Sequence, residues 1–270
     1  MTRKRILPLA AAVLCTLAAA GAHAGDEEPI SPDRPGVAET GEVVGKGRVQ
    51  LETSVQWERQ RDDALHTRTL STPTLLRIGL GERTELRVET DGRNVIHASD
   101  PATGERSTVA GYADTSLGLK WHVADQQGTG FGTPSLGVLL QADLPSGSRE
   151  LRGKGVRPSL SLPAEWELPG GYSLGVMPGL GVDSDDQDKR YGYGLLAAEL
   201  GKKFSERLGG FVELAAPQIA GASHGGIQAI VDAGFTWLVN KDCQLDVAVV
   251  HGLNRRSPDL GLAFGISLRR

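Results

Sequence analysis

Residues 49–58 read Val49-Gln50-Leu51-Glu52-Thr53-Ser54-Val55-Gln56-Trp57-Glu58 and alternate in polarity. Its odd-numbered side chains suit hydrocarbon, whereas every even-numbered side chain is polar. A repeat of two residues is that of a β-strand, in which successive side chains point to opposite faces of the sheet. The stretch therefore predicts a strand of about ten residues with one apolar and one polar face.

Further segments repeat this alternation along the chain. They lie at 85–89, 114–122, 135–143, 159–167, 227–237 and 259–268. Strands of about ten residues with one uniformly polar face are typical of a barrel that stands in lipid around a wet interior. After Ala24, no uninterrupted apolar stretch approaches the roughly eighteen residues that a membrane-spanning helix needs. Strands rather than helices are therefore expected to cross the membrane.

The alternation predicts about twelve strands, with about ten or fourteen as alternatives. They are expected near 48–59, 68–80, 84–94, 109–124, 134–144, 157–168, 172–183, 190–203, 208–218, 226–239, 243–252 and 259–269. If the first strand runs outward from the periplasm, long outer loops should alternate with short periplasmic turns. Short turns fall at 81–83, 169–171, 205–207 and 240–242, and longer connections fall at 95–108, 145–156, 184–189 and 219–225. The connection at 125–133 is longer than this rule allows.

Charged residues on the polar phase distinguish a barrel from a soluble sandwich. A sandwich also alternates, but its dry core cannot hold many charges, because each unpaired buried ion costs several kcal/mol. The sequence therefore predicts an all-β protein, a closed antiparallel up-and-down transmembrane β-barrel. The candidates for lining its lumen are Glu52, Arg77, Glu85, Arg87, Glu89, Asp114, Lys120, Asp143, Glu165, Glu167, Asp232 and Asp246.

These inward charges have two interpretations. Both signs occur on adjacent strands, which favours ion pairs along the lumen wall. The pairs expected are those of Arg77 and Arg87 with Glu52, Glu85 or Glu89, and of Lys120 with Asp114 or Asp143. Such a network either braces a narrow barrel or lines a solute path and selects what enters it. For any single residue, bracing is the favoured interpretation.

The first 24 residues have the pattern of a cleaved secretory signal. Basic residues at 3–5 precede an apolar run at 6–20, and Ala22-His23-Ala24 forms a cleavage site. The mature chain is expected to begin at Gly25, with an N-terminal periplasmic leader or partial plug at 25–47 and the barrel at 48–270. A lipid anchor at Cys15 is the alternative, but that cysteine follows Leu14 rather than a small residue.

Composition narrows the class of partner. The formal net charge of the whole chain is −4, and the signal contains three basic and no acidic residues, so the mature protein is more acidic. Nucleic acid is therefore not expected as a partner.

Only Cys243 remains after cleavage, which leaves no internal disulfide. The histidines are scattered, and residues 183–186 lack the glycine and terminal glutamate of a calcium loop, so no metal and no cofactor is expected.

All four tryptophans fall on the apolar phase near a predicted strand end; they are Trp57, Trp121, Trp166 and Trp237. In a membrane barrel, an aromatic girdle lies at these positions, at the level of the lipid headgroups. The alternative is that they fill the edge of a sandwich core.

Short motifs occur in order over nearly the whole mature chain. They are Ser31-Pro32-Asp33-Arg34-Pro35-Gly36, Gly47-Arg48-Val49-Gln50-Leu51-Glu52, Asp114-Thr115-Ser116-Leu117-Gly118-Leu119-Lys120-Trp121, Leu144-Pro145-Ser146-Gly147, Gln244-Leu245-Asp246, Gly252-Leu253-Asn254 and Ser257-Pro258-Asp259. Their order and spacing resemble the phenol-degradation meta-pathway-type transporters, a family of outer-membrane proteins. The resemblance implies a closed barrel that passes small, often hydrophobic or aromatic compounds, but it supplies no binding residues.

The resemblance also implies two partners besides the solute, namely the lipid of a Gram-negative outer membrane and the barrel-assembly machinery. Barrels of this kind usually end in an aromatic residue that resembles an assembly signal. This chain instead ends Ile266-Ser267-Leu268-Arg269-Arg270.

The leading functional hypothesis is a passive channel or facilitator that needs no cofactor. About twelve strands enclose a narrow interior, which suits a small solute. The segment at 33–46 is expected to stay in the periplasm or to fold into the lumen as a partial plug, anchored by Asp33, Arg34 and Pro35. A disordered leader is the alternative.

Two other functions remain as alternatives. A lipid-modifying enzyme on the barrel wall needs a serine activated by a histidine. Ser116 and His122 are separated along one strand, and His224 and His251 lie in or near loops, so catalysis is not expected. A structural or adhesive surface barrel would use its exposed loop charges, which are Arg106, Arg149, Arg152, Lys154, Asp185, Asp186 and Asp188.

Overall fold

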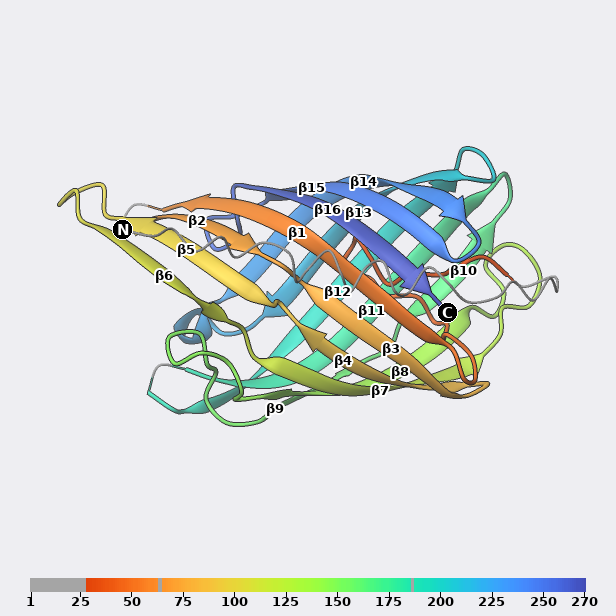
Figure 1. Cartoon of the computed structure of the whole chain (residues 1–270), viewed down its shortest axis with the longest axis horizontal. Coiled ribbons are helices and arrows are strands. Elements are labelled where there is room, and N and C mark those ends of the chain that lie inside the picture. Colours follow the sequence, from red (N-terminus) through yellow and green to blue (C-terminus); the bar gives the residue numbers. More distant parts are fainter. Residues whose placement is uncertain (1–27, 63–64, 186) are drawn as a thin grey trace, which may run out of the picture.

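One antiparallel sheet closes on itself to form a barrel (Figure 1). The structure is a computed structural model that describes residues 28–62, 65–185 and 187–270. Its strands are β1 (Val49–Arg61), β2 (His66–Ser71), β3 (Thr74–Gly81), β4 (Thr84–Thr90), β5 (Arg93–Ser99), β6 (Arg106–Tyr112), β7 (Thr115–Ala124), β8 (Ser135–Leu144), β9 (Arg157–Ser161), β10 (Ala164–Leu168), β11 (Tyr172–Ser184), β12 (Arg190–Lys203), β13 (Leu208–Ile219), β14 (Ile227–Asn240), β15 (Cys243–Gly252) and β16 (Leu260–Arg269). A short 3₁₀ helix, η1 (Ala222–His224), lies between β13 and β14.

Four barrel strands are each interrupted once, so these elements make a barrel of 12 strands. β2–β3, β4–β5, β6–β7 and β9–β10 each continue one strand across a break. Two of the breaks contain a proline, Pro73 or Pro163, which has no backbone N–H to give to the ladder. A third contains Gly92, whose φ is 63°. The predicted number of strands is confirmed, and the breaks are local departures from four of the predicted ranges.

The first and last strands close the barrel. β1 pairs with β16 from Gln50↔Arg269 to Arg59↔Leu260. Beside this ladder, Val49 N donates to Arg270 O and Arg270 N donates to Val49 O, both at 2.8 Å. Along this seam the sheet offers lipid no free strand edge, which is what a membrane barrel requires. The predicted closed antiparallel barrel is confirmed.

The distribution of polar and apolar side chains is the opposite of that in a soluble protein. Large side chains that are fully buried include Arg77, Arg87, Lys120, Gln50, Glu52, Glu85 and Glu213. Large exposed apolar side chains include Val55, Leu117, Leu140, Phe235 and Phe264. A polar interior within an apolar outer surface is the arrangement of a barrel in lipid.

The connections differ between the two ends of the barrel. At the end that holds the C-terminus, the turns after β3, β10, β12 and β14 are short, whereas the connection at 125–134 is longer, as expected (Figure 1). We call this the short-turn end and the other the long-loop end. The predicted loop at 95–108 is wrong, because β5 and β6 pair as a hairpin up to Ser99↔Arg106. Val95 and Ile96 are consecutive apolar residues that break the alternation, so the predicted strand ended too early.

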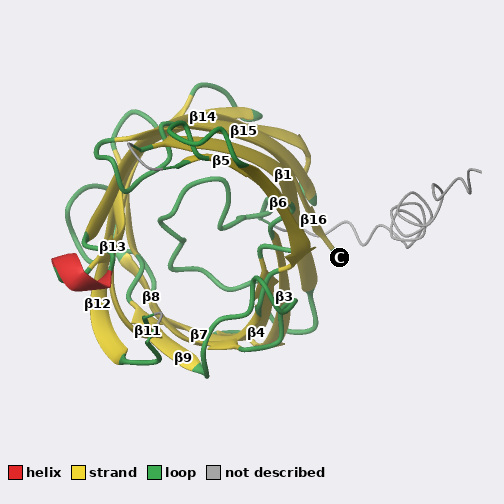
Figure 2. Cartoon of the chain, turned by 90° about the vertical axis from the view of Figure 1, so that its left-hand side faces the viewer, coloured by secondary structure: helices red, strands yellow, loops and turns green. Residues whose placement is uncertain are grey.

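The segment before β1 runs inside the barrel. Figure 2 shows a loop within the ring of strands, and hydrogen bonds join this segment to side chains of several strands. We call residues 28–47 the leader. The signal peptide expected at 1–24, and the expected mature start at Gly25, lie outside the described residues. In the described part of the chain, no helix is both long enough and apolar enough to cross a membrane.

Candidate functional site

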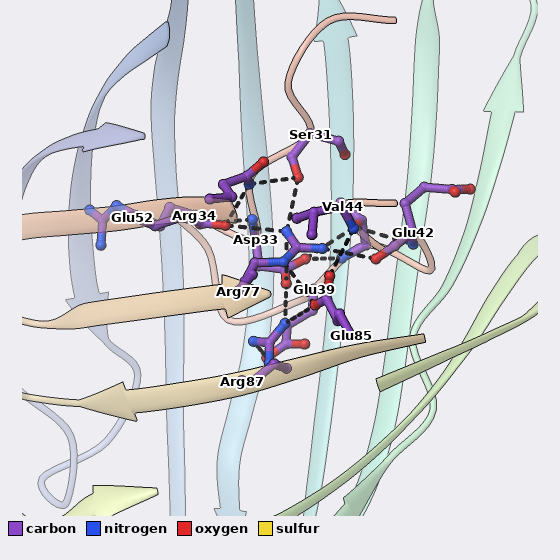
Figure 3. Close-up of polar contacts among 12 residues, drawn as sticks. Ser31, Asp33, Arg34, Glu39, Glu42, Val44, Glu52, Arg77, Glu85 and Arg87 are labelled. Atoms are coloured by element: carbon purple, nitrogen blue, oxygen red, sulfur yellow. Dashed lines mark hydrogen bonds and ion pairs between the residues drawn. The ribbon is translucent and has the colours of Figure 1, made fainter. Parts of the chain in front are cut away.

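Asp33 of the leader lies at the centre of a buried charge cluster (Figure 3). Lys120 Nζ on β7 lies 3.0 Å from each carboxylate oxygen of Asp33. Arg77 Nη1 on β3 lies 3.2 Å from its Oδ2, and Arg87 Nη1 on β4 donates to the same oxygen. Burial opposes ionisation of Asp33, but Arg77, Lys120 and Arg87 hold the pKa of this carboxyl well below its ordinary value. The leader thus presents a carboxylate to Arg77, Arg87 and Lys120, which we call the basic wall.

Two glutamates join the basic wall to the backbone of the leader. Glu85 Oε1 lies 2.8 Å from Arg77 Nε, and Glu85 Oε2 accepts Val44 N at 2.8 Å. Glu52 Oε1 lies 3.2 Å from Arg77 Nη1, and Glu52 Oε2 accepts Asp33 N at 3.0 Å. Both glutamates are fully buried, at 0% exposure. Each of them therefore pairs with the basic wall, Glu85 with both Arg77 and Arg87, and accepts one amide of the leader, as buried polar groups require.

The ion pairs differ in part from those expected. Arg77 contacts Glu52 and Glu85, as the sequence suggested. Lys120 contacts Asp33 and, at 3.5 Å, Glu39, both in the leader, rather than Asp114 or Asp143. Alternation places a side chain inside the barrel but does not identify a partner brought in from another segment, and that is why the expectation for Lys120 was wrong.

Three carboxylates lie side by side on another part of the wall. Glu199 on β12 is opposite Glu213 on β13, which is opposite Asp232 on β14. Glu213 accepts two backbone N–H groups of the leader, from Val37 at 2.7 Å and from Ala38 at 2.6 Å. We call Glu199, Glu213 and Asp232 the acidic wall.

Sequence reasoning missed Glu199 and Glu213. The signal for Glu213 was available, because Val212-Glu213-Leu214 places it on the polar phase between two apolar residues. Both flanking side chains are indeed exposed on the outer face, at 55% and 57%.

The leader connects the two walls. Asp33 brings negative charge to the basic wall, while the backbone N–H groups of Val37 and Ala38 point to the acidic wall. A Cβ on Gly36 would lie 2.9 Å from Glu199 Oε2, so the leader backbone rests directly on that wall. On β15, the strand next to β14, Asp246 forms a 3.0 Å ion pair with Arg34 of the leader. This arrangement matches the charge of each wall with a complementary group of the leader.

A cavity of about 590 Å³ lies next to the leader. Its lining combines leader residues, such as Arg34 and Val37, with Glu58 late in β1, Gln228 early in β14 and Pro258 just before β16. These barrel residues lie at the ends of their strands away from the short turns. The cavity therefore occupies the side of the leader that faces the long-loop end, and we call it the vestibule.

The other candidate lumen residues are in different environments. Asp114 and Asp143 lie 3.0 and 3.5 Å from Arg157, and Asp114 also accepts Gly147 N and Gly153 N, so it shapes the 145–156 connection. Glu167 is exposed, 3.7 Å from Lys203. Glu89 lines the vestibule, and Glu165 is half-buried on β10.

The tryptophans are found at both ends of the barrel. Trp121 and Trp237 are exposed, at 48% and 54%, and each lies within four residues of the C-terminal limit of its strand, near the short-turn end. Trp166 is half-buried at the same end and donates from Nε1 to Gly132 O at 3.0 Å. Trp57 is half-buried in the long-loop half of β1. The aromatic girdle stays a prediction.

The serine and histidine considered for catalysis have separate partners. Ser116 donates to Asp143 at 2.6 Å, and His122 contacts Gly41 O and Asp125. Sequence reasoning passed over Ser223, whose Oγ lies 3.2 Å from Nδ1 of His224. His224 Nε2 lies 3.7 Å from Asp185 Oδ2 at the long-loop rim. Among the expected loop charges, Asp186 lies outside the described residues.

Comparison with known proteins identifies the fold and the family. An outer membrane channel from Pseudomonas putida F1 has a TM-score of 0.61 and 12% identity, covering 88% of this chain and 99% of that one. The beta domain of the Bordetella autotransporter BrkA has a TM-score of 0.55 and 13% identity, covering 82% and 98%. No curated protein sequence matches the chain. Residues 32–269 match the model of the family described as "Putative MetA-pathway of phenol degradation", so the chain belongs to that family and is an outer-membrane β-barrel.

Proposed function

We propose that the protein is a channel through which small hydrophobic or aromatic solutes cross the outer membrane passively, with the leader as a movable obstruction. The observation that carries the proposal is the placement of the leader between the basic and acidic walls. Hydrogen bonds, ion pairs and the packing of Val37 and Ala38 hold the leader against the wall, and no disulfide fixes it there in the described residues. Segments bound in this way can leave and return, as in other gating transitions.

Two further features support passage rather than simple bracing. The vestibule provides space for a small molecule against the leader. The Pseudomonas putida protein with the same fold is described as an outer membrane channel. No cofactor is required for such passage, and the lumen charges that pair with each other away from the leader, such as Asp114 and Asp143 with Arg157, brace the barrel. Outer-membrane lipid and the barrel-assembly machinery are the further partners that we propose.

A disulfide between the leader and the wall tests the proposal. A Cβ on Gly175 would lie 4.0 Å from Cβ of Ala38, within the range that a disulfide spans. The variant A38C/G175C, made with C243S to remove the free cysteine, should lock the leader when oxidised and free it when reduced. The C243S protein alone is the matched control for the redox treatment.

The measurement is uptake of labelled benzyl alcohol by isolated outer-membrane vesicles, with and without the protein. We expect protein-dependent uptake that falls when the variant is oxidised and returns on reduction. Uptake that is unaffected by the lock would show that solute passes without movement of the leader. No protein-dependent uptake, together with phospholipid hydrolysis by the same vesicles, would favour an enzyme and direct attention to Ser223 and His224.

A further inference from the structure

Acidic side chains outnumber basic ones in the lining of the vestibule. The carboxylates on its surface are Asp33, Glu39, Glu52, Glu58, Glu89, Asp91 and Asp232, and the cationic groups are Arg34 and Arg87. Both guanidinium groups are already paired, Arg34 with Asp246 and Arg87 with Asp33, Glu39 and Glu85. They therefore leave little positive charge for a solute to meet.

Four carboxylates of the vestibule form no ion pair within the described residues; they are Glu58, Glu89, Asp91 and Asp232. Asp232 is the most informative, because it is only 4% exposed and its Oδ1 has no hydrogen-bond partner in the described part of the chain. A buried carboxylate oxygen without a partner is costly, and a cation placed beside it removes that cost.

Apolar side chains line the same cavity. Val37 of the leader, Leu75 on β3, Ile230 on β14 and Val250 on β15 all contribute to its surface. Asp232 and Val250 are direct neighbours across the β14–β15 ladder, so a carboxylate and an aliphatic surface lie side by side. A ligand that suits both has a hydrocarbon body and a positively charged group.

We propose that the vestibule is a binding site for small organic cations, of the aryl- or alkyl-ammonium class. The inference rests on the proposed function, since it describes which solutes the channel collects in front of the leader. Asp232 and Glu89 supply the charge that attracts the ammonium group, and the aliphatic residues contact its hydrocarbon part. Aromatic anions are repelled by the same carboxylates.

Three probes of similar shape test this specificity, because they share a benzene ring and differ in charge. They are benzyltrimethylammonium, benzyl alcohol and benzenesulfonate, and the two ions keep their charge at any ordinary pH. Binding is measured with the purified barrel in uncharged detergent, by calorimetry or ligand-observed NMR. We expect the cation to bind most tightly, the alcohol less tightly and the sulfonate least.

The variants Asp232→Asn and Glu89→Gln remove one charge each and keep the shape of the side chain. Each should weaken binding of benzyltrimethylammonium by about tenfold or more while leaving the affinity for benzyl alcohol unchanged. Asp188→Asn is the matched control, because Asp188 lies in a loop with its side chain 75% exposed, and binding should not change. Heat-modifiable migration on a gel shows that each variant forms a closed barrel, and Glu89→Gln maintains the test if Asp232→Asn does not fold.

Equal affinity for the three probes, or equal weakening of all three by both variants, would overturn the inference. Failure of the proposed function gives a different result. Uptake of benzyl alcohol by vesicles without any charge preference in binding would overturn the inference alone. Cation-selective binding without protein-dependent uptake of any probe would overturn the channel and leave the site.

Discussion

Replacing Asp33 with asparagine tests whether charge holds the leader in the lumen. Asparagine retains an oxygen that can accept the N–H of Thr40, but it loses the charge that lies 3.0 Å from Lys120 and 3.2 Å from Arg77. Breaking a buried ion pair by removing one partner costs about 3–5 kcal/mol. Glu39 stays 3.5 Å from Lys120, so we expect the low end of that range, about 3 kcal/mol.

A loss of about 3 kcal/mol lowers the ratio of docked to released leader by roughly a hundredfold, since each 1.4 kcal/mol is about tenfold. Single-channel recording in planar bilayers should therefore show more frequent and longer open states in Asp33→Asn than in the unmodified protein. Asp188→Asn is the control, because its exposed ion pair with Lys154 contributes only about 0–1 kcal/mol. If an Asp33→Asn barrel folds normally and has the open probability of the unmodified protein, charge does not hold the leader in the lumen.

Three more predictions concern the leader. Glu213→Gln leaves one of the two leader N–H groups without its acceptor, which costs about 1–3 kcal/mol. Bilayer recording should therefore show a rise in open probability that is smaller than the rise in Asp33→Asn. Gly79→Ala would place a Cβ 1.6 Å from Gly45 O, so the melting temperature of this variant, measured by heat-modifiable migration on gels, should fall by several degrees. Gly81→Ala is the control, because a Cβ there has nothing within 4 Å, and its melting temperature should not change. Because the pKa of Asp33 is lowered in the folded protein, its stabilisation is present above the ordinary value of 3.8 and is lost only as pH falls toward the lower folded value. The ratio of open probability between Asp33→Asn and the unmodified protein should therefore stay constant from about pH 7 to 5, and a ratio that falls in that window would contradict the role of Asp33.

The barrel could be predicted from the sequence because a period of two is a direct consequence of strand geometry. Residues 49–58 show this well, since Val55 is exposed to lipid while Glu52 and Ser54 are buried inside. The breaks at Pro73 and Pro163 were not predicted, because alternation continues across a proline even where the hydrogen-bond ladder does not. The hairpin of β5 and β6 was predicted too short, because the alternation is lost locally although the two segments are paired.

The candidate site was predictable only in part. Alternation places Arg77, Arg87 and Lys120 inside, but their main partner, Asp33, lies 87 residues before Lys120 in a segment without periodicity. The sequence named a partial plug anchored by Asp33 as one possibility, but a strand pattern does not decide between a leader in the lumen and one in the periplasm. The contacts of Glu213 with the N–H groups of Val37 and Ala38 are equally hidden, because any residue except proline supplies such a donor.

The position of the leader in the sequence has a consequence for the order of assembly. The leader is made before β1, yet the groups that bind it are spread from Gln50 on β1 to Arg269 on β16, at the end of the last strand. It can reach its final place only after nearly all strands have been inserted and the sheet has curled round. The last of its contacts can therefore form only when the final strands have joined the sheet, so closure of the barrel and completion of the leader's binding site are the same event.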